Sequence, residues 1–311
     1  MSAAVGNAPV QFAPTGSQLD VAYSVCRHLA RSAAKNFYYG FAVLPHPKRN
    51  SLCAVYAFMR RCDDITDNNH LSFHERHNKL AEWLDSVHKA LAGYPTDEPL
   101  LLALADTQRR YQIPIGLLDQ LAYGTAADLV EEPDEPGFAG PLTARYRTFE
   151  ELRQYCYGVA SVVGLVCIRI FGYRDPAAES LAERCGLAFQ LTNIIRDVKE
   201  DVAMGRVYFP EEDLAQAGLT TSDLAAPVPA RVAPLLAIEA DRAREGYRAG
   251  EELIPLVNED SQPGLWVLIT IYRSLLKKIA SRQYDVFSER VSLSLREKLT
   301  ILGKGYVKRM L

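Results

Sequence analysis

A helical spacing of apolar residues runs through most of this 311-residue chain and constrains its fold more than any other feature. Within residues 20–34, Val21, Val25, Leu29 and Ala33 recur every four positions, which aligns them on one face of a helix. Strand-like alternation of apolar and polar residues is scarce. Further runs with helical spacing are residues 51–61, 73–91, 98–111, 115–130, 149–171, 177–203, 231–254, 264–287 and 294–309. We therefore predict an all-α fold of about ten helices.

Three stretches rich in Pro, Gly or acidic residues, 131–141, 205–210 and 220–234, are predicted to be loops. None of them is long enough to require a domain boundary, and no internal repeat is visible. The first 18 residues are polar and contain Pro and Gly. We predict a flexible segment over residues 1–18, followed by a single helical domain over residues 19–311.

Opposite charges nearly balance, with 35 Lys and Arg against 38 Asp and Glu, so the chain lacks the positive charge that favours nucleic acid binding. The six cysteines include no C-x-x-C pair and have mostly apolar neighbours, which indicates reduced, buried thiols in a cytoplasmic protein. Residues 1–18 lack the pattern of a signal peptide. The longest uncharged apolar stretch, 155–168, is shorter than the ~20 residues of a spanning helix, so no membrane span is expected.

The first of two acidic clusters comprises Asp63, Asp64 and Asp67 and follows Arg60 and Arg61. On a helix Asp63 and Asp67 are one turn apart, so their carboxylates share a face at about 6 Å between Cβ atoms. Two like charges at that spacing repel one another unless a cation lies between them, and carboxylate oxygens suit Mg²⁺. For an isolated pair, a solvated helix end is the alternative interpretation.

The second cluster places Asn193, Asp197 and Asp201 at intervals of four, so three oxygen ligands line up along two turns of a helix. Arg196 adjoins it, as Arg60 adjoins the first cluster. Two such clusters suit a diphosphate held through Mg²⁺, because the metal neutralises the phosphate oxygens and the guanidinium groups bind them bidentately.

Together the clusters resemble those of the trans-isoprenoid synthases, and their surroundings resemble the squalene/phytoene synthase branch. The segments that carry this resemblance are residues 35–39 (KNFYY), 54–58 (AVYAF), 155–160 (YCYGVA), 190–197 (QLTNIIRD) and 205–210 (GRVYFP). The similarity extends from about residue 20 to the C-terminus. It implies an isoprenoid-synthase-type helical domain around a central cavity, with the acidic clusters facing each other across its mouth. It also implies an enzyme that joins two prenyl diphosphates head to head through a cyclopropylcarbinyl diphosphate.

The resemblance assigns roles to individual residues. It implies that Mg²⁺, with Mn²⁺ as an alternative, is held by Asp63, Asp67, Asn193, Asp197 and Asp201. The implied substrate-binding residues are Lys35, Phe37, Tyr56, Arg60, Arg61, Gln190, Asn193, Arg196, Tyr272, Arg290 and Lys298. The implied catalytic residues are Tyr155, Arg60 and Arg196, with Tyr155 assisting departure of diphosphate or a later proton transfer.

A carbocation formed from an allylic diphosphate needs a dry, apolar surrounding. Phe37, Phe41, Phe189 and the face of residues 159–168 are candidates for that wall, although residues 162–166 also fit plain helix packing. The chain departs from its relatives at Asn36 and Tyr38, where many have Ser, and at Thr125, where the family's G-M-x-x-D-L element has Met. Asp128 of that element is a weaker site candidate.

The expected reaction is the condensation of two farnesyl diphosphates to presqualene diphosphate, because residues 36–41 and 58–61 look most like those of bacterial presqualene diphosphate synthases. The alternative product is phytoene, formed from two geranylgeranyl diphosphates. No G-x-G-x-x-G motif is present, so the sequence gives no support for NADPH as a cofactor.

Two other classes of function are weaker candidates. Head-to-tail chain elongators usually carry a second D-D-x-x-D and terpene cyclases an N-x-x-x-S/T-x-x-x-E triad, and Asp197 and Asp201 fit neither pattern well. A non-catalytic helical assembly factor would be expected to have lost its aspartates, whereas both clusters are intact here.

The C-terminal segment, residues 290–311, carries six Lys and Arg and one Glu. Because the implied substrates and products are lipids, we expect peripheral contact with a membrane through exposed apolar or basic surface. Prenyl diphosphates are the other expected partners.

Overall fold

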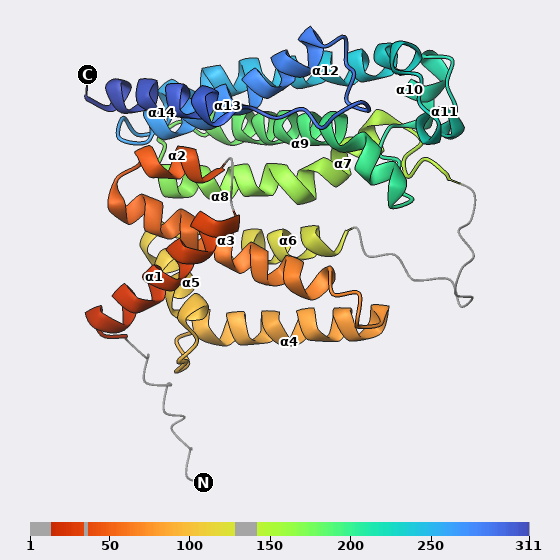
Figure 1. Ribbon diagram of the computed structural model, residues 1–311. Helices are drawn as coiled ribbons and strands as arrows, with labels where there is room; N and C mark the ends of the chain where they lie inside the picture. Colours follow the sequence, from red (N-terminus) through yellow and green to blue (C-terminus); the bar gives the residue numbers. More distant parts are fainter. Residues whose placement is uncertain (1–13, 34–36, 128–141, 311) are drawn as a thin grey trace. The chain divides into compact units, whose positions relative to one another are not determined.

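The computed structural model describes residues 14–33, 37–127 and 142–310 (Figure 1). These residues form helices and loops, with isolated β-bridges and no strand, so the predicted all-α fold is confirmed. The chain divides into two compact units. Unit 1 comprises residues 1–35 and 46–129, and unit 2 comprises residues 36–45 and 130–311. The single domain over residues 19–311 stays a prediction.

Unit 1 is built around one buried helix. Its helices are α1 (Gly16–Ala33), α3 (His46–Thr66), α4 (Phe73–Leu91), α5 (Pro99–Tyr111) and α6 (Ile115–Ala126). Helix α3 packs against each of the other four, and its residues from Leu52 to Val55 are almost wholly inaccessible. An apolar run without a polar face is what a helix surrounded by others requires.

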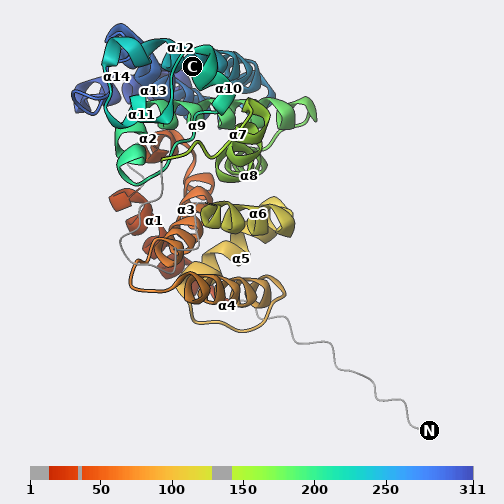
Figure 2. The same cartoon turned by 90° about the vertical axis from the view of Figure 1, so that its right-hand side faces the viewer.

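Unit 2 has α9 (Ala177–Ala203) at its centre. Figures 1 and 2 both show α9 between a layer of α12 (Pro229–Leu253) and α13 (Gln262–Ser281) and a layer of α7 (Phe149–Cys156) and α8 (Val162–Phe171). The remaining helices are α2 (Phe37–Val43), α10 (Glu211–Gln216), α11 (Thr221–Ala225) and α14 (Leu295–Met310), with a short 3₁₀ turn at Ile254–Leu256. Small buried residues, among them Ala182, Gly186 and Ala188, let neighbouring helices approach α9 closely.

One π-helical turn, η1 (Tyr157–Ser161), joins α7 to α8, where the sequence predicted an uninterrupted helix. The turn packs against α9, and Ser161 Oγ donates a hydrogen bond of 2.8 Å to the carbonyl of Glu183. A π-turn inserts a residue into a helix and occurs frequently at functional sites. The whole segment Phe149–Phe171 is long and apolar enough by composition to span a membrane, but here it packs against α9 within unit 2.

Four predicted boundaries were wrong. Helix α6 ends at Ala126 instead of residue 130. Helix α1 begins at Gly16 instead of residue 20, because Thr15 and Gln18 cap it reciprocally: Thr15 N–H donates to Gln18 Oε1 at 2.8 Å and Gln18 N–H to Thr15 Oγ1 at 3.3 Å. Helix α3 begins at His46, before the predicted residue 51, since a proline in the first turn is tolerated. Helix α13 ends at Ser281 because Gln283 and Tyr284 adopt a left-handed conformation.

The predicted loop 220–234 is also wrong, since it contains α11 and the start of α12. A capping box between Thr220 and Asp223 starts α11, and Pro229 occupies the first turn of α12. Pro234 lies inside α12. The carbonyl of Ala230 that it leaves without a helical donor belongs to an exposed residue and can bind water. The six cysteines are free thiols and five of them are buried, as predicted.

Candidate active site

Helix α3 brings four of the predicted site residues onto one face. Tyr56, Arg60, Asp63 and Asp67 follow one another at spacings of four, three and four, which is the repeat of a single helical stripe. Asp67 lies one residue beyond α3, but its N–H still donates to the Asp63 carbonyl at 2.8 Å. The helical geometry assumed for the aspartate pair is therefore present.

The surroundings of the Asp63 carboxyl disfavour its ionised form. Burial, together with the nearby Asp67 charge, raises the pKa of Asp63 to about 6, although Arg60 opposes the shift. Arg60 itself forms a salt bridge of 2.7 Å with the exposed Asp64. The Asp63–Asp67 pair thus keeps a like-charge repulsion that a bound cation would relieve.

Arg61 lies away from that face. It follows Arg60 directly and so points about 100° further around α3. Its guanidinium lies over the Trp83 ring of α4 at 5.7 Å from the ring centroid, a cation–π contact within unit 1. Its predicted role in binding diphosphate is not tested by this contact and stays a prediction.

Helix α9 provides the second stripe, formed by Gln190, Asn193, Asp197 and Asp201 at spacings of three, four and four. The Asn193 Nδ2 donates to Gln190 Oε1 at 3.4 Å. Its Oδ1 is buried and has no hydrogen-bond partner of ordinary geometry among the described residues. A buried acceptor without a donor is costly, so a ligand that binds this oxygen would remove the penalty.

Asp197 is bound by two arginines. Arg196 Nε donates to its Oδ1 at 2.7 Å and Arg196 Nη2 to its Oδ2, while Arg290 Nη2 donates to Oδ1 at 2.5 Å. Arg290 also lies 3.4 Å from Glu200. Burial alone would raise the pKa of Asp197, but the hydrogen bonds and charges of Arg196 and Arg290 hold it below its ordinary value. The structure therefore brings together three predicted residues, of which Arg290 is 93 positions from Asp197 in the sequence.

An aromatic cluster surrounds Phe189, one turn before Asn193 on α9. The Phe189 ring stacks on Tyr272 with centroids 4.5 Å apart, and Phe37 of α2 contacts both rings at 6.4 and 5.5 Å. Tyr247 of α12 joins the cluster at 6.0 Å from Phe189. Burial raises the pKa of Tyr272 to about 12, against the opposing charge of Arg196. Phe41, also a wall candidate, is buried on α2.

Tyr155 is held in a stack of tyrosines that sequence reasoning missed. Its ring lies 5.2 Å from Tyr208 and 5.6 Å from Tyr146. Tyr208 belongs to the segment after α9, where Arg206 N–H donates to the Asp201 carbonyl at 2.8 Å. The segment 205–210 thus links the second acidic cluster to the predicted catalytic tyrosine. Its sequence, GRVYFP, was the feature from which the involvement of this segment in the site could have been predicted.

The remaining predicted residues are dispersed or not described. Lys298 Nζ lies 5.7 Å from the Tyr39 ring centroid, which brings α14 to α2 within unit 2. Lys35, Asn36 and Asp128 lie outside the described residues. Of the wall candidates in residues 159–168, Val162 and Val166 are fully buried, whereas Val163 and Leu165 are only partly covered.

No three His, Cys, Asp or Glu side chains among the described residues are arranged to hold a metal on their own. The donor sets nevertheless fit Mg²⁺. In unit 1 the partly buried Asp63 keeps the repulsion of the exposed Asp67, which Arg60 offsets only in part, and in unit 2 the unpartnered Asn193 Oδ1 adjoins Asp197. Both sets consist of the oxygen ligands that Mg²⁺ prefers, and Mg²⁺ usually takes only one or two carboxylates beside phosphate oxygens and water.

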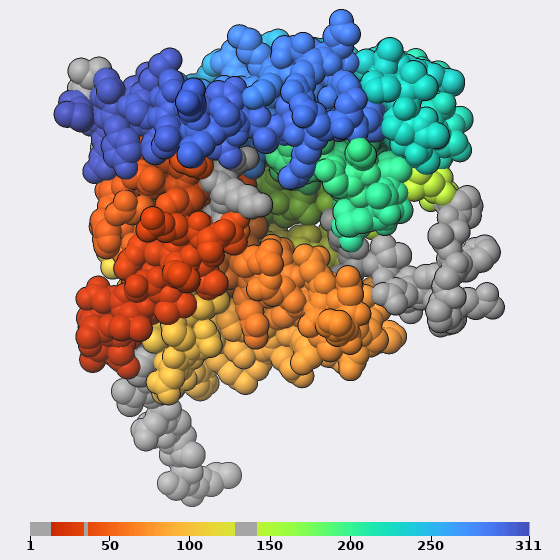
Figure 3. All heavy atoms as spheres, viewed as in Figure 1, coloured from red at the N-terminus to blue at the C-terminus, as the bar shows by residue number. Residues whose placement is uncertain are grey.

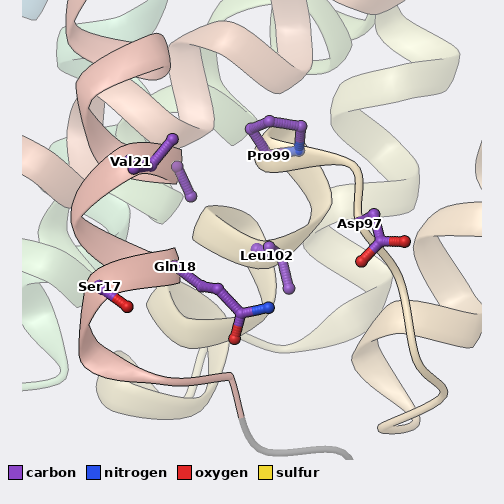
Figure 4. Close-up of a pocket in the computed structure, with 7 residues that line it drawn as sticks. Ser17, Gln18, Val21, Asp97, Pro99 and Leu102 are labelled. Atoms are coloured by element: carbon purple, nitrogen blue, oxygen red, sulfur yellow. The ribbon is translucent and has the colours of Figure 1, made fainter.

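A small pocket of about 280 Å³ in unit 1 lies apart from these residues (Figure 4). It is lined by the first turns of α1 and the start of α5, with Ser17, Gln18, Val21, Ala22, Asp97, Pro99 and Leu102. None of the predicted site residues contributes to it.

Comparison with known proteins identifies relatives along most of the chain. The squalene/phytoene synthase family profile matches residues 30–297. The phytoene synthase of Mycobacterium tuberculosis is 36% identical over 291 residues, covering 92% of this chain and 90% of its own length. That of Arthrospira platensis is 33% identical, covering 90% of this chain and 91% of its own.

Two solved structures share the fold. A dehydrosqualene synthase in complex with a ligand superposes with a TM-score of 0.80 at 27% identity, covering 94% of this chain and 97% of its own. The squalene synthase HpnC from Alicyclobacillus acidocaldarius gives a TM-score of 0.76 at 29% identity, covering 87% and 97%. The two aspartate stripes, the arginines beside them and these similarities lead to one conclusion: the chain belongs to the squalene/phytoene synthase family of prenyltransferases.

Proposed function

We propose that this prenyltransferase joins two C20 geranylgeranyl diphosphates head to head to give phytoene. The observation that supports the C20 substrate is the set of curated relatives named phytoene synthase, which are 31–36% identical to this chain over at least 90% of its length. This proposal replaces the expectation of farnesyl diphosphate from residues 36–41 and 58–61.

The second candidate is condensation of two C15 farnesyl diphosphates. It is favoured by the solved structures, whose names are those of dehydrosqualene and squalene synthases. Their identities of 27% and 29% are lower than those of the phytoene synthases, and we therefore rank the C15 reaction second.

For binding the diphosphates, we propose that Asp63 and Asp67 hold Mg²⁺ in unit 1, and that Asn193, Asp197 and Asp201 hold it in unit 2. Mg²⁺ bound there would supply the positive charge that stabilises a departing diphosphate. Arg60, Arg196 and Arg290 would donate hydrogen bonds to the diphosphate oxygens. Arg196 and Arg290 already bind the Asp197 carboxylate, so each has to exchange that partner for the substrate. Lys35, Arg61 and Lys298 remain predicted contributors.

For the carbon chemistry, the proposal depends on excluding water from the carbocation. The aromatic cluster of Phe37, Phe189 and Tyr272 offers a dry surface next to Arg196. Tyr155, fixed by Tyr146 and Tyr208, is proposed to accept or donate a proton near the reacting carbons. Ending the reaction by proton loss leaves a double bond and uses no reductant, so phytoene formation requires no NADPH.

The direct test incubates the purified enzyme with geranylgeranyl or farnesyl diphosphate and Mg²⁺, with and without NADPH, and determines the product by mass spectrometry. We expect a C40 hydrocarbon from the C20 substrate without NADPH. Exclusive turnover of the C15 substrate would show that the second candidate is correct, and loss of turnover in Tyr155→Phe with unchanged substrate binding would support the role of Tyr155.

A further inference from the structure

The C-terminal helix α14 carries an exposed apolar stripe. Five of the eleven large apolar side chains that are exposed in the described residues belong to this helix. Four of them, Leu295, Leu299, Tyr306 and Met310, are spaced by four, seven and four residues and are 41–85% exposed. These spacings align them along one side of the helix. We call these four residues the α14 stripe.

The stripe belongs to a firmly held helix. On another side of α14, Ile301 and Gly305 are buried against unit 2, and a Cβ at Gly305 would lie only 2.3 Å from Val267 Cγ2. Tyr306 donates a hydrogen bond of 3.0 Å to the Ala42 carbonyl, and Arg309 donates one of 2.9 Å to the Val43 carbonyl. Figure 1 shows α14 beside α13, and the dark blue spheres in Figure 3 show its outer surface uncovered. The helix therefore has two apolar faces. Ile301 and Gly305 pack against unit 2, and the α14 stripe faces solvent.

Basic side chains border the stripe. Arg296 is exposed on one flank, and Lys298 and Arg309 lie on the other. The one acidic residue of α14, Glu297, is already paired with Lys278 at 3.0 Å. The solvent face thus combines an apolar centre with a positively charged rim. This is the pattern of a helix that lies in the headgroup region of an anionic membrane, where lysine and arginine reach phosphates and tyrosine bridges apolar and polar layers.

We propose that the α14 stripe docks unit 2 onto an anionic lipid bilayer, with Leu295, Leu299, Tyr306 and Met310 inserted between the headgroups. The proposal goes beyond the proposed function and does not depend on it, although a lipid substrate would give the docking a purpose. A second copy of the chain fits the surface less well. Two stripes packed together would bring their basic rims into contact, and a stable interface needs about 20–30 residues a side.

The test measures sedimentation of the full chain with vesicles in the absence of substrate. We expect binding to vesicles that contain phosphatidylglycerol, much weaker binding to pure phosphatidylcholine, and loss of binding at high salt. Leu299→Gln combined with Met310→Gln should weaken the binding at least about tenfold. Arg296→Gln should weaken it only for anionic vesicles.

A matched control is Val21→Gln combined with Val228→Gln, which removes two apolar side chains of 61% and 60% exposure, one on α1 and one just before α12. It should bind vesicles like the wild type. All variants should keep the wild-type circular dichroism and melting temperature, because every changed side chain is exposed. Equal vesicle binding by the stripe variant and the wild type would overturn the proposal, as would a dimer in sedimentation velocity that only the stripe variant abolishes. Because no substrate is present, either outcome leaves the proposed reaction untouched.

Discussion

At the scale of single residues, the surroundings of the Asp63 carboxyl destabilise its charged form. The carboxyl is largely buried, it faces Asp67 at one helical turn, and its nearest cation, Arg60, is paired with Asp64. Native proteins tolerate such strain mainly where a ligand uses it. The same reasoning applies to Asn193 Oδ1, which is buried without a donor.

Replacing Asp63 by Asn should therefore separate stability from activity. Without metal we expect the free energy of unfolding at pH 7 to rise by roughly 1–3 kcal/mol, because the like-charge repulsion and the buried charge are removed. Mg²⁺-dependent diphosphate release should fall at least about a hundredfold. Thermal unfolding and a diphosphate assay measure the two effects.

The control is Asp85→Asn, which removes an exposed carboxylate of unit 1 that pairs with Lys89 at 2.5 Å. Such surface pairs contribute about 0–1 kcal/mol, so both stability and turnover should change little. An Asp63→Asn variant that is less stable and fully active would contradict the assignment.

A second residue-scale prediction concerns a buried acid far from the aspartate stripes in sequence. Glu239 of α12 is fully inaccessible and shares the Arg242 guanidinium with the buried Asp213 of α10. Burial raises the pKa of Glu239 to about 8, with Asp213 adding to the shift and Arg242 opposing it. The folded protein therefore keeps a proton that the unfolded chain loses above pH ~4.5, so the contribution of Glu239 to stability falls as the pH rises from about 4.5 to 8.

Glu239→Gln removes this titration. The stability of the variant relative to the wild type should increase between pH 5 and 8 by roughly 1 kcal/mol per pH unit. Glu245→Gln, an exposed change on the same helix, should show a constant difference. Urea titrations at a series of pH values measure both, and a pH-independent difference for Glu239→Gln would refute the assignment.

At the scale of elements, periodicity predicted most helices but not their interruptions. Helix α9 was predicted with the correct bounds, because its long apolar face and the stripe from Gln190 to Asp201 share one period. The π-turn at Tyr157–Ser161 was missed because one inserted residue hardly changes an apolar pattern. Helices α2 and α11 are too short for periodicity to detect.

The π-turn and α9 approach so closely that a methyl group should disturb them. A Cβ at Gly186 would lie 2.7 Å from Ser161 Cα and 2.8 Å from the Ala160 carbonyl oxygen, both backbone atoms that cannot rotate away. Gly186→Ala should cost about 1–3 kcal/mol of stability and reduce turnover, since the turn begins two residues after Tyr155.

Gly303→Ala is the control, because Gly303 also lies inside a helix but has room for a methyl group. Nothing lies within 4 Å of a Cβ there, so the variant should be about 0.5–1 kcal/mol more stable. Chemical denaturation measures both variants, and equal effects at the two glycines would contradict the close approach.

At the scale of the whole molecule, the aspartates that the proposal requires are divided between two units, Asp63 and Asp67 in one and Asp197 and Asp201 in the other. The sequence could predict which residues share each helical face, since that follows from spacing alone. It could not predict the partners of those residues from distant segments, such as Arg290 for Asp197 or Tyr208 for Tyr155, because such contacts depend on the packing of helices far apart in the chain. The central cavity implied by the family resemblance stays a prediction.

The central claim is that both aspartate stripes take part in one head-to-head condensation of two prenyl diphosphates. The most direct measurement is the amount of diphosphate released per hydrocarbon formed from geranylgeranyl diphosphate with Mg²⁺, for the wild type, Asp63→Asn and Asp197→Asn. We predict two diphosphates per C40 hydrocarbon for the wild type and neither product for the two variants, whose folding is verified by circular dichroism. Diphosphate release without a C40 product, or full turnover in either variant, would contradict the claim.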